Sequence, residues 1–148
     1  LVEVKGKASS AFASNWENKI IELGKNTFGW KSLKLNFGKK QVTMTVTETN
    51  GKSYELPFGY QQWITTTFDS YPPYSITPIG RFKGLEGPYY ASGSYAWISK
   101  EELQLKAHYV NWVSALEITF HLEENGEVKL NVQTNYIKKP YTIIGKIK

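Results

Sequence analysis

A serine within a stretch of small and aromatic residues is the first side chain whose type suggests chemistry. Ser94 lies in "PYYASGSYAW", residues 88 to 97. Serine enzymes need a base at a set distance, either a lysine three positions later or the G-x-S-x-G turn with a distant histidine. No serine in the chain has either spacing. We therefore predict that Ser94 is structural, that the chain carries no catalytic residue, and that the small residues around it let a neighbouring strand or ring approach closely.

Histidines and carboxylates are the next candidates. His108 and His121 each fall on the polar side of an alternating stretch, so we expect both to be exposed. A metal site needs at least a third ligand with inward geometry, and no spacing provides it. Acidic pairs such as Glu55 and Glu86 carry nothing that separates them from ordinary surface charge. The sequence predicts no metal and no cofactor.

Aromatic residues are unusually frequent, at 15% of the chain. On apolar faces they are expected to fill the interior of a wide barrel. Others lie in or beside loops, where an exposed ring is unfavourable unless a ligand or partner covers it. These predicted ligand- or partner-binding residues are Tyr71, Tyr74, Tyr89, Tyr90 and Trp112.

Alternating apolar and polar residues determine the expected fold. "QVTMTVTE", "LQLKAHYV", "LEITFHL" and "EVKLNVQ" all have period two, which is typical of half-buried strands. Further strands are expected near 18–24, 31–37, 61–68, 89–97 and 141–147. Roughly nine strands with short turns indicate an all-β chain, built as an antiparallel meandering barrel or sandwich. We expect a single domain over residues 16–148, preceded by a linker or N-terminal extension over 1–15.

Strand register can be predicted from face matching across three hairpins. Three-residue loops at 49–51 and 124–126 keep the apolar faces aligned, and each ends in a glycine suited to a left-handed turn. A third hairpin is expected to pair Leu105 with Ile118 and Leu103 with Phe120. The same register sets Lys106 opposite Glu117 on the outer face.

Composition excludes several classes of function. The net charge is +5, but the basic residues are 17 lysines and one arginine scattered along the chain, so we predict no nucleic-acid binding. There is no cysteine, which removes disulfides and thiolate sites. No apolar run is long enough to span a bilayer, and the first residues lack the order of a signal peptide.

The order of several motifs resembles that of a known domain. "NTFGWKSLKLNF", "GKSYELPFGYQQW", "PYYASGSYAWISKEELQLKAHYVNWVSALEITFHLEENGEVKLNVQ" and "IIGKI" occur in that order from about residue 15 onward. Together they resemble the C-terminal domain attached to serine hydrolases of the β-lactamase and penicillin-binding-protein-like family. The stretch "YVNWVS" departs from the more acidic, proline-containing turn that is usual there.

This resemblance implies a fold, a partner and a location. It implies a lipocalin-like (calycin-like) antiparallel β-barrel that follows a catalytic domain and has no established chemistry of its own. We therefore expect a non-catalytic accessory domain that packs on the N-terminal catalytic domain of a periplasmic or extracellular parent and shapes substrate access, with contacts to a small molecule or cell-wall fragment. The alternative is a stand-alone lipocalin-like barrel that binds a small apolar ligand or a glycan.

Overall fold

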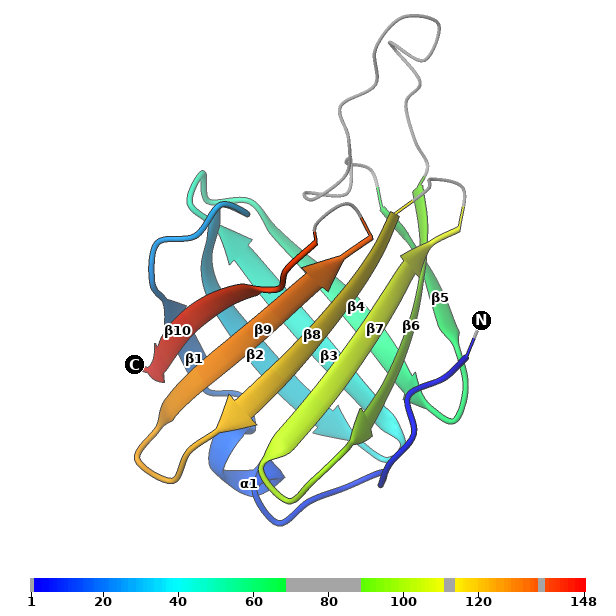
Figure 1. Cartoon of the computed structure of the whole chain (residues 1–148), viewed down its shortest axis with the longest axis horizontal. Coiled ribbons are helices and arrows are strands. Elements are labelled where there is room, and N and C mark those ends of the chain that lie inside the picture. Colours follow the sequence, from blue (N-terminus) through cyan, green and yellow to red (C-terminus); the bar gives the residue numbers. More distant parts are fainter. Residues whose placement is uncertain (1, 69–88, 111–113, 136–137) are drawn as a thin grey trace, which may run out of the picture.

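The chain folds almost entirely into β-strands. The structure, a computed structural model, describes residues 2–68, 89–110, 114–135 and 138–148 (Figure 1). Besides the short helix α1 (Ala13–Trp16), the elements are the strands β1 (Ile20–Leu23), β2 (Trp30–Gly38), β3 (Gln41–Glu48), β4 (Ser53–Tyr60), β5 (Ile64–Phe68), β6 (Tyr89–Trp97), β7 (Glu102–Tyr109), β8 (Ser114–Leu122), β9 (Glu127–Thr134) and β10 (Tyr141–Ile147). The predicted all-β barrel is confirmed, with ten strands described.

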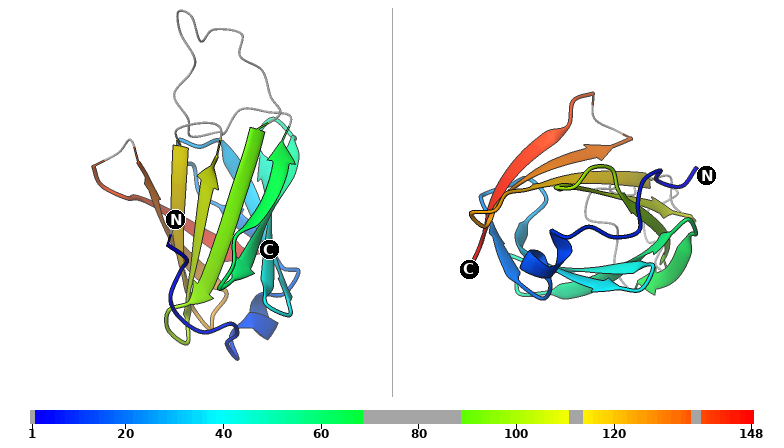
Figure 2. Two further views of the ribbon diagram at one scale, coloured as in Figure 1. Left: turned by 90° about the vertical axis from the view of Figure 1, so that its right-hand side faces the viewer. Right: turned by 90° about the horizontal axis from the view of Figure 1, so that it is seen from below.

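One continuous sheet curls round to form the barrel (Figure 2). Its strand order is β4-β3-β2-β1-β10-β9-β8-β7-β6-β5, and every neighbouring pair is antiparallel. A short parallel contact between β4 and β6, at Gly59–Ser94 and Tyr60–Tyr95, closes a ring of nine strands. Strand β5 pairs with residues 89–93 of β6, on the same edge that β4 contacts. Closure leaves few free edges for unwanted pairing.

The predicted registers of the three hairpins are confirmed. Val46 pairs with Tyr54 and Leu122 with Val128, so both loops hold three residues. Their glycines, Gly51 and Gly126, have φ of 89° and 83°, which a residue with a Cβ adopts reluctantly.

The third hairpin aligns both faces as expected. Leu105 pairs with Ile118 and Leu103 with Phe120, while Lys106 and Glu117 form a 3.7 Å ion pair outside. The inward-facing side chains singled out by the sequence are each at most 3% exposed; they are Leu103, Leu105, Leu116, Ile118, Phe120, Val128 and Leu130. A side chain beside a void large enough for water would keep accessible surface. The interior around these residues is therefore filled.

One end of the barrel, here called the helix end, is covered by the first residues of the chain (Figures 1 and 2). Phe12 and Trp16 belong to the same hydrophobic cluster as the strands. Lys7 and Trp97 exchange backbone hydrogen bonds of 2.9 and 2.8 Å, and the Tyr95 hydroxyl donates to the Ala8 carbonyl at 2.9 Å. The sequence predicts a linker or N-terminal extension over residues 1–15, and this domain division stays a prediction. Within this segment, Phe12 and Val4 are buried against the barrel.

The small residues of β6 allow close packing, as the sequence predicted. A Cβ added to Gly93 would lie 2.3 Å from the Pro57 carbonyl oxygen and 2.8 Å from the Phe58 ring. Strand β4 can therefore cross β6 only where β6 lacks a side chain. This contact lies beside the β4–β6 pairing that closes the barrel.

Candidate functional site

Of the five residues predicted to bind a ligand or partner, the structure describes two, and the prediction for the set stays a prediction. Tyr71, Tyr74 and Trp112 lie outside the described residues. Tyr89 and Tyr90 begin β6 and point to opposite faces, since Tyr89 is 3% exposed and Tyr90 is 41% exposed. Tyr89 is thus part of the interior, and Tyr90 of the outer wall.

The structure instead gathers polar side chains inside the barrel, at the end opposite the helix end. Strands β2, β4 and β8 begin there and β7 and β9 finish there, which follows from their antiparallel order. Their terminal inward-facing residues make up what we call the polar layer: Trp30, Tyr54, Tyr109, Ser114 and Thr134. Below it the inward positions are aliphatic or aromatic, apart from glycines such as Gly93 and Gly145.

Tyr54 is the most perturbed group of the polar layer. Burial raises the pKa of its hydroxyl far above the usual 10.0, and the nearby Tyr109 raises it further, while Trp30 acts in the opposite direction. Tyr54 is therefore a neutral phenol at any physiological pH and can both donate and accept a hydrogen bond. It sits on β4 and Tyr109 on β7, the two strands that flank β6 in the closed ring.

Two buried polar atoms of this layer lack hydrogen-bond partners among the described residues. They are the Ser114 hydroxyl oxygen and the Trp30 indole nitrogen, on residues that are 5% and 2% exposed. The Trp30 N–H lies beside the Tyr54 hydroxyl without forming a hydrogen bond of normal geometry. An unpaired buried polar group costs about 1–3 kcal/mol. Such groups at the end of a barrel suit a ligand or partner that brings donors and acceptors of its own.

Three further buried atoms lack partners among the described residues, and they lie elsewhere. They belong to Asn36, Trp63 and Trp97. Trp97 is near the helix end, where its backbone pairs with Lys7. The polar layer is the place where two such groups share one end of the interior.

The polar layer was missed at the sequence level, although a signal existed. Ser114 and Thr134 fall on the same alternating face as Leu116 and Val132, where an apolar residue is expected. A polar residue on an apolar face at the end of a strand is a weak indication of a site. It becomes informative only when the strand order shows that the start of β8 and the end of β9 lie at the same end of the barrel.

Ser94 lies beneath the N-terminal segment of the chain. It is fully buried, and its hydroxyl accepts a hydrogen bond from the Val4 backbone N–H at 3.3 Å. It shares a face with Lys106 on the outer wall, where the N-terminal segment covers it. This contact uses the hydroxyl oxygen as an acceptor from the backbone.

Both histidines face outward as predicted, but each is half-buried instead of exposed. The Trp63 ring meets His108 edge-on at 5.3 Å, and burial lowers the His108 pKa, with Lys106 adding to the effect. The His121 Nδ1 atom lies 3.6 Å from the Glu102 Oε2 atom. Within the described ranges no three His, Asp or Glu side chains are placed to hold a metal ion.

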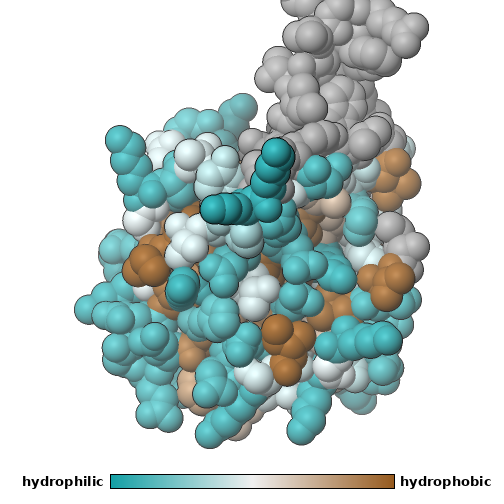
Figure 3. Space-filling model, in the orientation of Figure 1, coloured by the Kyte–Doolittle hydropathy of each residue, from teal (hydrophilic) through white to brown (hydrophobic). Residues whose placement is uncertain are grey.

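No protein-family model and no curated protein matches the chain. In the described part of the chain, no helix is long and apolar enough to cross a membrane. The face seen in Figure 3 is mostly hydrophilic, with hydrophobic residues scattered over it. What the structure defines is therefore a closed β-barrel with a polar layer at one end.

Proposed function

We propose that the chain is a non-catalytic accessory domain of a serine hydrolase related to β-lactamases and penicillin-binding proteins, in a periplasmic or extracellular parent. The observation that carries the non-catalytic part is the burial of Ser94, whose hydroxyl accepts from the Val4 backbone. The motif order from "NTFGW" to "IIGKI" supports the accessory part. The end with the polar layer is the face that meets the catalytic domain and shapes its access.

The test has a genetic and an enzymatic arm. The coding sequence immediately upstream of Leu1 is read, and the purified chain is assayed with β-lactam and ester substrates. An upstream S-x-x-K motif in an α/β domain, together with an inactive isolated chain, is the expected result. Hydrolysis by the isolated chain that disappears in Ser94→Ala would overturn the proposal.

A second candidate function is binding of a small neutral ligand in the polar layer. The buried Ser114 hydroxyl, which has no partner among the described residues, favours it, because a hydroxylated ligand would supply one. The filled interior below argues for a small ligand held near the end of the barrel. A small aromatic alcohol or a monosaccharide fits this chemistry better than a long apolar chain.

We predict opposite stability effects for two buried serines. Ser114→Ala should raise the free energy of unfolding by about 1 kcal/mol, because it removes an unpaired buried hydroxyl. The matched control Ser92→Ala should lower it by a similar amount, since Ser92 shares a 2.7 Å hydrogen bond with Thr65. Urea unfolding measures both.

Ligand binding is then followed by tryptophan fluorescence with phenol and with glucose as probes. Binding to the natural chain and to Ser92→Ala, but not to Ser114→Ala, is expected if the polar layer is a ligand site. Equal binding to all three, or none to any, counts against this second function. A Ser114→Ala variant that is less stable would show that the hydroxyl is satisfied in solution.

A further inference from the structure

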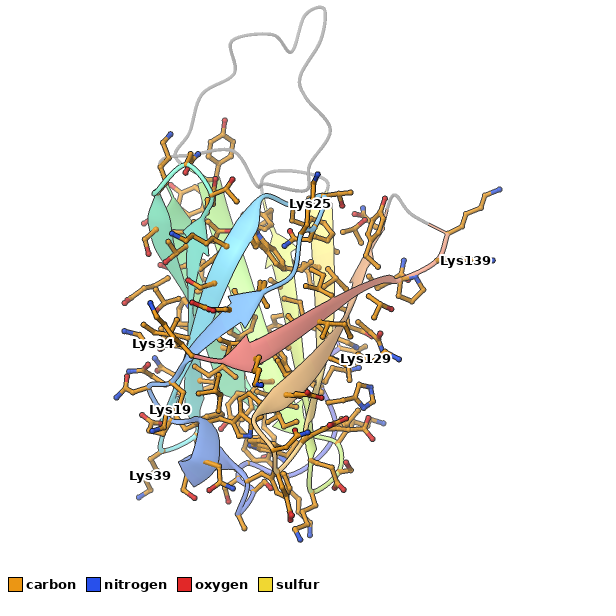
Figure 4. All side chains as sticks on the ribbon, turned by 90° about the vertical axis from the view of Figure 1, so that its left-hand side faces the viewer. Lys19, Lys25, Lys34, Lys39, Lys129 and Lys139 are labelled. Atoms are coloured by element: carbon orange, nitrogen blue, oxygen red, sulfur yellow. The ribbon has the colours of Figure 1, made fainter. Side chains whose placement is uncertain are left out.

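The lysines, scattered in the sequence, are segregated in the fold. Strands β9, β10, β1, β2 and β3 are consecutive in the sheet, and we call their outer face with its turns, residues 17–52 and 127–148, the lysine wall (Figure 4). Its described residues include twelve lysines against four glutamates, a net charge of +8. The other described residues have four lysines against seven glutamates, a net of −3. The barrel is therefore strongly polarised from one side to the other.

Two exposed aliphatic side chains lie among these lysines. Ile20 on β1 is 47% exposed; it is paired with Lys34 on β2, and its carbonyl accepts the Lys148 backbone N–H. Ile144 on β10 is 58% exposed and is paired with Lys129 on β9. Both strands direct their neighbouring residues, Ile21 and Ile143, into the core. The wall thus presents flexible cations around separate apolar side chains.

We propose that the lysine wall docks on an anionic lipid surface. Lysines on flexible stems are non-directional charges, which suits a mobile array of phosphate headgroups, while exposed aliphatic side chains can enter the boundary between headgroups and acyl chains. Protein interfaces are instead depleted in lysine and enriched in arginine and aromatic residues. Single-stranded nucleic acid would call for a row of rings on which bases stack, and among the wall's described residues Tyr141 is the one large exposed ring. This inference is independent of the proposed accessory role.

The first test removes charge at two lysines of the wall. Lys19 and Lys129 are exposed, are labelled in Figure 4, and make no ion pair within the described ranges. The natural chain should bind vesicles of phosphatidylcholine with about 30% phosphatidylglycerol and not pure phosphatidylcholine vesicles. The double variant Lys19→Gln/Lys129→Gln should bind roughly twenty-five-fold more weakly, since each surface lysine contributes about a fivefold factor.

The matched control removes the same charge from the other side. Lys5→Gln/Lys100→Gln lowers the net charge equally, but both lysines lie outside the lysine wall. It should keep most of the vesicle binding. Circular dichroism and urea unfolding of both variants show that neither has lost the fold. Equal weakening by the two doubles would mean that net charge alone matters, and would overturn the proposal.

The apolar part of the proposal is tested separately. Ile144→Ser should weaken vesicle binding roughly fivefold. The control Ile98→Ser changes a similarly exposed side chain, 42% exposed, outside the lysine wall and should have little effect. Two outcomes would refute lipid docking. The first is equal binding of the chain to anionic and to neutral vesicles. The second is displacement of the chain from vesicles by duplex DNA, together with an equal loss of DNA binding in Lys19→Gln/Lys129→Gln. The second would define a general polyanion site.

Discussion

At the scale of single residues, Gly93 shows how one missing side chain sets the packing of two strands. The Pro57 carbonyl oxygen occupies the space of its Cβ, at 2.3 Å. We predict that Gly93→Ala lowers the free energy of unfolding by about 2 kcal/mol or more, because β4 and β6 must separate where they close the barrel.

The control for Gly93→Ala is Gly38→Ala. A Cβ added at Gly38 would lie 3.5 Å from its nearest neighbour, the Gln41 carbonyl oxygen, and Gly38 does not adopt a left-handed φ. Urea unfolding of both variants measures the difference. Similar free energies for the two would contradict the close contact at Gly93.

Tyr54 should make the fold sensitive to alkaline pH. Its folded-state pKa is raised by burial and by Tyr109, so the unfolded chain releases this proton more readily than the folded one. Its contribution to stability is then complete below pH 10.0, the usual phenol value, and is lost as the pH rises above it. Tyr54→Phe should reduce the loss of stability in this range. Unfolding curves of the natural chain and of the variant at pH 8 and at about pH 10.5 measure the difference.

At the scale of elements, the strands and hairpins could be predicted because their cause is local. Alternation fixes which side chains face inward, and a three-residue loop ending in Gly51 or Gly126 is the choice that keeps these faces aligned. Contacts between distant segments carry no such local signal. The hydrogen bond from Tyr95 to Ala8 at the helix end and the parallel β4–β6 contact join segments 87 and 35 residues apart.

The candidate site was predictable only in part, for the same reason. The sequence places the aromatic residues Tyr89 and Tyr90 beside a loop, but they lie on opposite faces of β6 and so have different environments. The polar layer draws one residue from each of five strands, so no spacing in the sequence brings Trp30, Tyr54 and Ser114 together. Strand order had to be known first.

At the scale of the whole molecule, the charge distribution should make stability depend on salt. The lysine wall, which comprises five adjacent strands with their turns, carries twelve lysines and only four glutamates, so its lysines repel one another in the folded state, whereas the unfolded chain separates them. Sodium chloride at about 0.15 M screens charges beyond about 8 Å. We predict that the free energy of unfolding increases when salt rises from about 0.01 M to this level.

The increase should be smaller in Lys19→Gln/Lys129→Gln than in Lys5→Gln/Lys100→Gln, because only the first pair belongs to the lysine wall. A free energy of unfolding that falls with added salt would mean that attraction between lysines and glutamates outweighs repulsion across the wall.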